Sequence, residues 1–223
     1  MPRTEADKEL IKKSLFSPYS IENALTPSEV DGLLRYFRDS DDKELKSTGP
    51  LTLGVPKDDL SLPPFKTVLD KFGHLFGDDT HVFTALYFQV SFPHIIHNDD
   101  SFEFPLVCGG LNIPLEIKGN DETQFVIFDQ YYLDGPAKFF NGDAFVPTHY
   151  NQQIYSYESV VGLTDKSVTD EQMSILTHLR PRWLQGLSVQ AVLPWRPGLV
   201  NVFHPANLHC SGDFRKSGVT TNK

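Results

Sequence analysis

Two short fragments of this sequence carry side chains that could bind a metal ion. The first is His97-Asn98-Asp99, in the stretch FPHIIHNDD, and the second is His209, in VNVFHPANLHCSG. If the first fragment is the end of a strand, His97 and Asp99 point to the same side, because side chains at i and i+2 share a face. Two imidazoles and one carboxylate that leave coordination positions open are the ligand set of non-haem Fe(II) sites. The sequence therefore predicts a metal centre that activates oxygen.

Neighbouring residues offer alternative ligands in the first fragment. Asp100 could replace Asp99, but it lies three residues from His97, and on a strand this spacing turns a side chain to the other face. His94 and His97 would converge on a helix, whereas Pro93 and the aromatic residues before it favour a strand. We therefore expect His97 and Asp99 to be the ligands from this fragment.

The second fragment belongs to a longer pattern. The turn W-R-P-G at 195–198 leads into the apolar run 199–203, and His209 is followed by C-S-G. This order resembles the 2-oxoglutarate and Fe(II)-dependent dioxygenases, of the phytanoyl-CoA hydroxylase-like or TauD-like kind. In that family a P-G-D-L-x-x-F turn and strand lead to a histidine that small residues follow. The resemblance covers about residues 81–223, and it favours His209 over His204 as the distal ligand.

This resemblance implies a fold, a set of cofactors and a reaction. The fold would be a double-stranded β-helix, a jelly-roll or cupin-like barrel, and the cofactors would be Fe(II), 2-oxoglutarate as co-substrate and O2. Family members that halogenate lack the carboxylate ligand, whereas Asp99 is present here. The implied reaction is therefore hydroxylation, or a related oxidation of a C–H bond, with release of succinate and CO2.

The co-substrate contacts depart from the family pattern. In the family, an Arg or Lys about ten or more residues past the distal histidine holds the far carboxylate of 2-oxoglutarate, which a guanidinium fits well. Arg215 follows His209 by only six residues and could equally be a solvated loop cation, and Lys223, fourteen residues on, is the last residue given. Further candidates are polar residues within apolar runs: Asn112, Gln130 and Tyr87.

Helices are expected mainly in the first third of the chain. Thr26-Pro27-Ser28-Glu29 combines a capping threonine with a proline for the first turn and a glutamate that reaches back to the cap. Apolar residues at helical spacing follow this signal, and a second short helix is expected at 65–72, ended by Gly73 or Gly77. The cap signature T-D-E-Q at 169–172 begins a later helix.

Strands are expected in most of the remainder. Segments that are rich in β-branched and aromatic residues, with turn residues between them, are 81–92, 104–107, 111–117, 124–132, 154–161, 187–193 and 199–203. Helices followed by many short strands predict a mainly β fold with flanking helices, of the jelly-roll or cupin kind.

We expect a single domain overall, in which residues 1–80 form a helical segment that packs on the barrel. Residues 81–223 would form the catalytic core, with a helical insertion at about 134–186 that shapes the substrate site. Arg180 and Arg182 in this insertion could hold an anionic substrate or pair at a helix end. A small-molecule substrate is expected.

The bulk composition narrows the class of protein. The net charge is −9 and no cluster of Lys and Arg is present, which argues against nucleic acid as a partner. The first residues are charged, without a secretory signal, and no apolar run is long enough to span a membrane. Cys108 and Cys210 have no C-x-x-C spacing, so two free thiols are favoured over one disulfide. A cytoplasmic location without a membrane partner follows as the expectation.

Two other functions remain open at this point. A cupin-type metal enzyme would keep the barrel and the metal but would not use 2-oxoglutarate. A non-catalytic barrel that binds or senses a ligand would carry the three side chains without the reaction. The oligomeric state is not predicted from the sequence.

Overall fold

The structure is a computed structural model of the 223-residue chain. It describes residues 3–45, 51–77, 81–82, 84–100, 108–119, 122–139, 145–147 and 160–222, with the backbone alone for 44–45, 138–139, 145–147 and 221–222. The expected strand at 104–107, most of that at 154–161, and Lys223 lie outside the described residues.

In the described part of the chain, four α-helices flank the strands: α1 (Glu5–Ser14), α2 (Pro27–Asp39), α3 (Pro63–Phe72) and α4 (Asp170–Ile175). The two capping signals in the sequence form as predicted, because Thr26 and Thr169 each cap a helix and exchange hydrogen bonds with the third helical residue. Helix α3 ends at Gly73, also as predicted. Short 3₁₀ turns are η1 (Lys57–Ser61), η2 (Gly73–Phe76), η4 (Pro181–Leu184) and η5 (Phe214–Ser217).

The described strands pair in antiparallel sheets. One sheet has the order β1 (Tyr19–Ile21), β11 (Val200–Phe203), β5 (Gly110–Asn112), and another β10 (Val189–Trp195), β7 (Thr123–Tyr131), β12 (Asn207–Ser211). A third has β2 (Glu44–Leu45), β3 (Leu51–Gly54), β4 (Leu86–Gln89). Two pairs complete the set: β13 (Thr221–Asn222) with β6 (Ile117–Lys118), and β8 (Ala137–Phe139) with β9 (Phe145–Pro147).

The predicted mainly β class is therefore confirmed, with differences in the bounds of strands. Of the strand expected at 81–92, the structure has β4, with a lone bridge residue after it, and the run 111–117 is divided between β5 and β6. Helix α1 and strand β1 were not anticipated. The first 80 residues also supply β1 and β3, which pair with strands from later in the chain.

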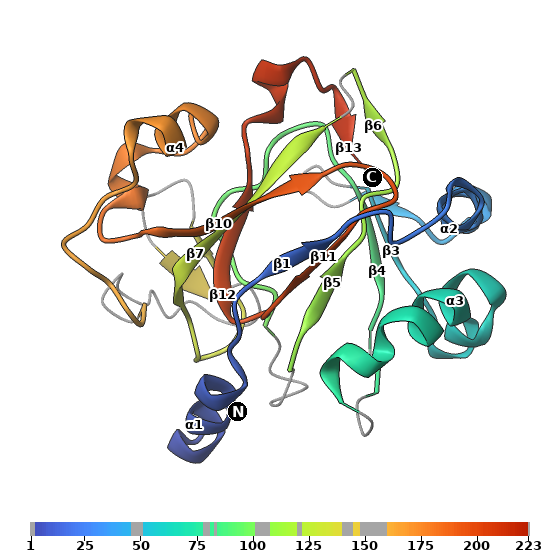
Figure 1. The fold of residues 1–223 in the computed structure, drawn as a ribbon, viewed down its shortest axis with the longest axis horizontal. Coiled ribbons are helices and arrows are strands. Elements are labelled where there is room, and N and C mark those ends of the chain that lie inside the picture. Colours follow the sequence, from blue (N-terminus) through green and yellow to red (C-terminus); the bar gives the residue numbers. More distant parts are fainter. Residues whose placement is uncertain are drawn as a thin grey trace.

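Two sheets face each other, and helices cover their outer sides (Figure 1). Phe125, Ile127, Leu193 and Phe203 fill the layer between the β10-β7-β12 and β1-β11-β5 sheets. A cluster that includes residues of α4, η4 and the outer side of β7 covers the first sheet, and α2 and α3 pack on the outer side of β11. Both sheets are thus held in place on two sides.

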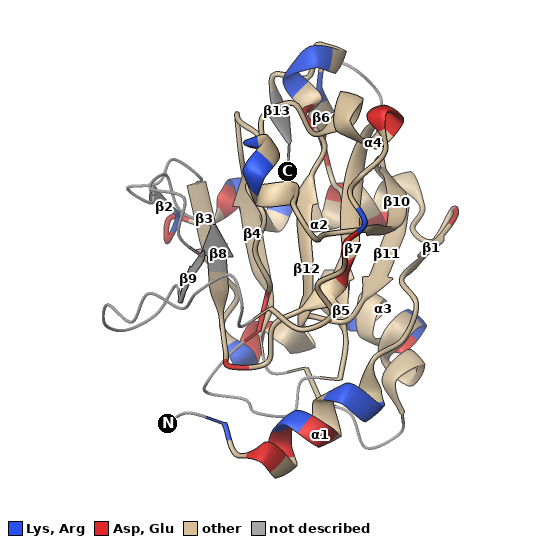
Figure 2. Cartoon of the chain, turned by 90° about the vertical axis from the view of Figure 1, so that its left-hand side faces the viewer, with Lys and Arg blue, Asp and Glu red and all other residues tan. Residues whose placement is uncertain are grey.

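Charged residues gather on the helices and connections, and the strands in the middle of the molecule are mostly uncharged (Figure 2). Cys108 and Cys210 form no disulfide with each other, as favoured from the sequence. Cys210 is buried on β12, and burial raises the pKa of its thiol. Among the described residues, no helix combines the length and the apolar character needed to cross a bilayer.

Candidate metal centre

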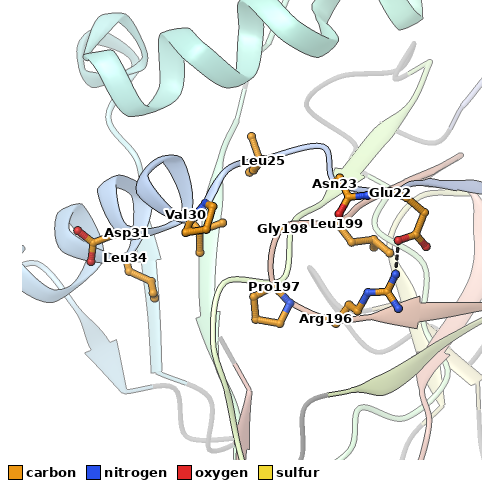
Figure 3. Close-up of a pocket in the computed structure, with 11 residues that line it drawn as sticks. Glu22, Asn23, Leu25, Val30, Asp31, Leu34, Arg196, Pro197, Gly198 and Leu199 are labelled. Atoms are coloured by element: carbon orange, nitrogen blue, oxygen red, sulfur yellow. Dashed lines mark hydrogen bonds and ion pairs between the residues drawn. The ribbon is translucent and has the colours of Figure 1, made fainter.

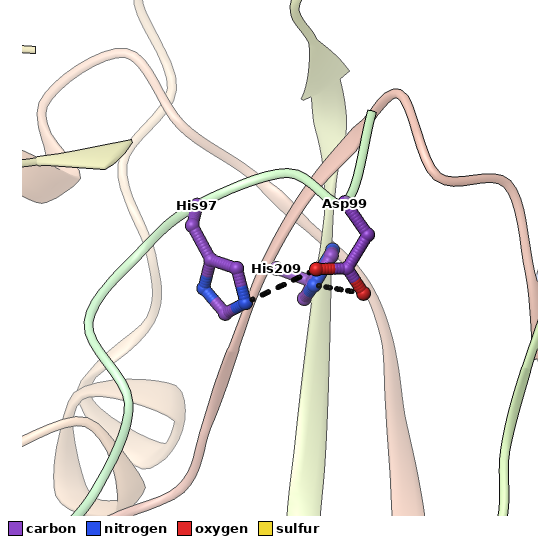
Figure 4. A group of neighbouring side chains, drawn as sticks. All are labelled: His97, Asp99 and His209. Carbon is purple, nitrogen blue, oxygen red and sulfur yellow. Dashed lines mark ion pairs between the residues drawn. The ribbon is translucent and has the colours of Figure 1, made fainter. Parts of the chain in front are cut away.

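The structure brings His97, Asp99 and His209 together (Figure 4). One ligand atom from each residue lies within 4.8 Å of the others. His97 Nε2 is 3.5 Å from Asp99 Oδ1, and His209 Nε2 is 3.4 Å from Asp99 Oδ2. The two imidazoles thus face the carboxylate with the same ring nitrogen, one at each oxygen.

The other nitrogen of each ring is used by the backbone. His97 Nδ1 lies 2.8 Å from the carbonyl oxygen of Ile95, and His209 Nδ1 lies 2.9 Å from that of Asn207. A carbonyl oxygen only accepts hydrogen bonds, so we assign the ring proton to Nδ1 in both residues. This tautomer leaves the Nε2 lone pair free to bind a metal, and the carbonyl fixes the orientation of the ring.

Main-chain bonds join the two fragments that are 112 residues apart in the sequence. The amide of His97 donates to the carbonyl of His209 at 3.0 Å, and the amide of His209 donates to that of His97 at 2.8 Å. The amide of Asp99 donates to Pro205 at 2.9 Å. Residues 97–99 are thus a short stretch bridged to β12 and not the end of a longer strand.

The neighbours of Asp99 turn away from the group. Asn98 is buried, where its amide nitrogen donates to the carbonyls of Tyr132 and Gly135 and its oxygen accepts from the amide of Ala137. Asp100 is also buried, in an ion pair with Arg3. The structure therefore places Asp99, and not Asp100, beside the two histidines.

His204 lies in the turn before β12, as the sequence predicts, and does not join the group. Its Nδ1 accepts from the amide of Ala206 at 3.1 Å, and its Nε2 is 3.0 Å from Ser14 Oγ. Burial, and then the positive charge of Arg3, lower the pKa of His204 to about 4. His204 is therefore a neutral structural residue.

Electrostatics favour a cation at the three side chains. Burial, and then the nearby His209, lower the pKa of His97 to about 3. Desolvation by the surrounding protein would raise the pKa of Asp99, but His209 and then His97 outweigh it and hold that pKa below its usual value. At neutral pH the group thus offers an ionised carboxylate beside a neutral imidazole, as a divalent metal requires.

The group is open on one side. The side chain of His209 is 2% exposed, that of His97 is 23% exposed and that of Asp99 is 52% exposed. The rings of Phe125 and Phe203 pack against the His209 ring, with centroids 5.2 and 5.1 Å away. A metal held here would face the protein interior through His209 and solvent through Asp99.

The expected co-substrate residues are dispersed. Asn112 on β5 lies opposite Asn201 on β11, and residues that lie opposite each other point to the same face of a sheet. Asn201 shares its face with Phe203, whose ring contacts His209, so Asn112 is on the side of the sheet that faces His209. Gln130 instead donates to the carbonyl of Gly162 and accepts from the amide of Ser188.

Tyr87 and Arg215 point to other partners. The hydroxyl of Tyr87 donates to the carbonyl of Leu33 in α2, and its ring packs against Tyr36, Phe37 and Phe65. The side chain of Arg215 is 55% exposed, and its Nε is 3.4 Å from Asp213 Oδ1. Neither residue is shown in contact with the three metal-ligand candidates.

Three residues near the centre are not among the binding residues expected from the sequence, which weighs His94 only as a ligand on a helix. The His94 ring lies 5.5 Å from that of His97 and 6.4 Å from that of Phe88. Thr123 Oγ1 and Trp195 Nε1 are buried with no hydrogen-bond partner in the described structure, and the two residues are paired across β7 and β10. The sequence signal for the latter pair was weak, since Thr and Trp are ordinary residues of strands.

A surface pocket of ≈ 360 Å³ lies elsewhere, between the start of α2 and the turn at 196–199 (Figure 3). Its apolar lining includes Leu25, Val30 and Leu199, and Arg196 forms an ion pair with Glu22 at its rim. None of the three metal-ligand candidates lines it.

Comparison with known proteins gives a likeness of fold. No protein-family profile and no curated protein sequence matches this chain. Two structures of the epimerase SnoN have a TM-score of 0.51 and 12% identity. The first is in complex with Fe3+, alpha ketoglutarate and nogalamycin RO and is matched over 97% of this chain and 81% of its own. The carbocyclase SnoK, also alpha ketoglutarate dependent, has a TM-score of 0.49 and 12% identity, over 99% of this chain and 81% of its own.

Proposed function

We propose that this chain is an Fe(II)- and 2-oxoglutarate-dependent oxygenase that oxidises a C–H bond of a small molecule and releases succinate and CO2. The observation that carries the proposal is the convergence of His97, Asp99 and His209, open to solvent on one side. The likeness in fold to SnoN, whose complex contains Fe3+ and alpha ketoglutarate, supports the same cofactors. We further infer that the two facing sheets are the halves of a double-stranded β-helix.

The three side chains fit the metal. The Nε2 atoms of His97 and His209 and one oxygen of Asp99 would hold it, and this donor set is the one that non-haem Fe(II) oxygenases use. When bound, the iron would activate O2, which is the oxidant, and 2-oxoglutarate would supply two of the electrons; no protein side chain provides this chemistry. The chain contributes orientation, because the backbone carbonyls fix both rings, and it shields His209 from water through Phe125 and Phe203.

Two unsatisfied donors support a site for the co-substrate. The ring centroid of Phe125 lies 5.2 Å from that of His209 and 6.4 Å from that of Trp195. Trp195 and Thr123, which is its partner on the neighbouring strand, are therefore separated from His209 by the Phe125 ring. A buried hydroxyl and indole N–H without partners are costly unless a ligand accepts from them. A carboxylate of 2-oxoglutarate would accept from both, with Asn112 as a further candidate contact.

The substrate would approach from the side of Asp99. Phe88 is 45% exposed, and its ring lies 6.4 Å from that of His94, which in turn lies 5.5 Å from the ring of His97. These aromatic rings favour a small molecule with an apolar portion that packs against Phe88.

Anaerobic titration with Fe(II) and then 2-oxoglutarate tests the proposal. We expect a visible metal-to-ligand charge-transfer band for the wild-type chain. The variant His209→Ala should lose the band, whereas His204→Ala, which removes a histidine outside the group, should retain it. Loss of the band in His204→Ala alone would show that the distal ligand is misassigned. Absence of iron binding in the wild-type chain would contradict the proposal.

A second candidate is a metal enzyme of the same fold that does not use 2-oxoglutarate. The observation that favours it is the ion pair between Arg215 and Asp213. While it is paired with Asp213, the Arg215 guanidinium does not bind the far carboxylate of 2-oxoglutarate. Stoichiometric iron binding without the charge-transfer band would support this second function over the first.

A further inference from the structure

We propose that Arg3 is a positioning residue of the metal centre, which directs the Asp99 carboxylate toward the metal through its ion pair with Asp100. The N-terminal segment, residues 3–16, would then be a structural part of the site. This inference rests on the metal centre proposed above and adds to it a part of the chain that lies far from the ligands in the sequence.

The ion pair between Arg3 and Asp100 is buried and has two contacts. The side chains are 2% and 4% exposed. Arg3 Nη2 donates to Asp100 Oδ1 at 2.5 Å, and Nη1 donates to Asp100 Oδ2 and, at 3.0 Å, to the carbonyl of Leu133. A planar guanidinium that binds both oxygens of a carboxylate fixes its direction as well as its position.

Asp99 depends on its neighbours for its orientation. Its side chain is half exposed, and the imidazoles of His97 and His209 lie beside its carboxylate. The residue before it, Asn98, is fixed by three buried hydrogen bonds, and the residue after it, Asp100, is fixed by Arg3. The backbone of Asp99 is therefore held from both sides, and the Arg3 pair is one of the two anchors.

The same N-terminal segment also supports the turn under Asp99. The amide of Asp99 donates to the carbonyl of Pro205, which lies next to His204. Ser14 at the end of α1 is hydrogen-bonded to the His204 ring, at 3.0 Å. Ile11 of α1 is buried against Ala206 in the same turn. Residues 3–16 thus contact both segments that fix the Asp99 backbone.

Stability alone does not account for a buried pair of this kind. The removal of two charges from water costs free energy that their attraction only partly repays, so apolar residues of similar size are often equally stable in such a place. What the ion pair adds is a defined geometry. Groups that are hydrogen-bonded directly to metal ligands typically change metal affinity by about 10- to 100-fold when they are removed, and Arg3 would act through the residue next to a proposed ligand.

The test compares metal affinity with stability in a set of variants. Anaerobic titration with Co(II), a coloured substitute for Fe(II), gives the affinity from its visible absorbance, and thermal unfolding of the metal-free chain gives Tm. We expect Arg3→Met to weaken Co(II) binding at least about tenfold and to lower Tm. The double variant Arg3→Met/Asp100→Leu removes the unpaired charge, so it should recover Tm while the affinity stays low.

Two further variants separate the guanidinium from the rest of the segment. Arg3→Lys keeps the charge without the fork and should give an intermediate affinity. Lys8→Met removes another ion pair of α1, in which Lys8 Nζ lies 2.7 Å from Asp134 Oδ1 and both side chains are partly exposed. This variant should leave the affinity for Co(II) unchanged.

The outcomes distinguish this inference from the function on which it rests. Wild-type affinity in Arg3→Met, or an affinity that follows Tm in every variant and returns in the double variant, would overturn the inference alone. Absence of Co(II) binding by the wild-type chain would overturn the proposed metal centre, and the positioning role with it.

Discussion

At the scale of residues, His204 shows how a histidine can be excluded from a metal site. Its Nδ1 must stay unprotonated to accept from the amide of Ala206, and its Nε2 is used by Ser14. The ring is thus held neutral in a buried turn, although it lies only five residues from His209 in the sequence.

This environment predicts a pH dependence of stability. The pKa of His204 is about 4 in the folded chain and 6.5 for an ordinary histidine. Between these values the unfolded chain takes up a proton that the folded chain does not, so stability is complete above pH 6.5 and falls as the pH drops toward 4. At pH 5 the loss should be about 2 kcal/mol.

Urea unfolding at pH 7 and pH 5 measures this loss, with His204→Gln as the comparison. His97 and His178 also have lowered pKa values and act in the same direction, so only the difference between wild type and variant is assigned to His204. An equal loss in both proteins would contradict the assignment.

The grouping of His97 with Asp99 could be predicted because an extended chain alternates its side chains, and this local rule separates Asp99 from Asp100. The roles of Tyr87 and Gln130 depend on what lies beyond each strand. Tyr87 is hydrogen-bonded to α2, and the side-chain amide of Gln130 is hydrogen-bonded to the backbone of Gly162 and Ser188. Arg3 pairs with Asp100, which lies 97 residues later in the sequence, and no local sequence pattern predicts such a pair.

At the scale of elements, the start of α2 is stabilised by reciprocal bonds. The amide of Thr26 donates to Glu29 Oε2 at 2.7 Å, and the amide of Glu29 donates to Thr26 Oγ1 at 3.4 Å. Thr26→Ala should therefore lower the free energy of unfolding by about 1 kcal/mol. Thr26→Ser keeps the hydroxyl and should stay close to wild type in the same urea measurement; an equal loss in both would show that the cap is not the cause.

Helices with local signals were predicted correctly, whereas strand bounds were less accurate. The caps of α2 and α4 and the end of α3 depend on residues within one turn. Strands depend on partners that are remote in the sequence. β1 has only three residues and pairs with β11, about 180 positions later, so neither its existence nor its bounds follow from its own composition.

At the scale of the whole molecule, metal binding and folding should be linked. The proposed ligands come from segments that are 112 residues apart and meet only in the folded chain. A metal at 100 times its Kd should then stabilise the protein by about 2.7 kcal/mol. A rise in Tm on addition of Co(II), absent in Asp99→Ala and reversed by a chelator, would show this; a rise of equal size in Asp99→Ala would place the metal elsewhere.

The mainly β class could be predicted because strand composition and turns repeat through the second part of the chain. The order of the strands could not. In the β10-β7-β12 sheet the central strand comes from early in the core and its two partners from the end, so the pairing depends on the packing of the entire molecule. The same long-range pairing places His209 opposite Ile127 and beside His97.

The reciprocal bonds between His97 and His209 have a consequence for hydrogen exchange. Each of these two amides is protected by the other residue's carbonyl, and His97 is held to β12 by this bridge outside any regular strand. A local opening that frees one amide therefore frees the other. The protection factors of the two amides should therefore stay matched, and both should rise when a metal is bound. The pair of amide protons would then report how often the His97–His209 bridge opens.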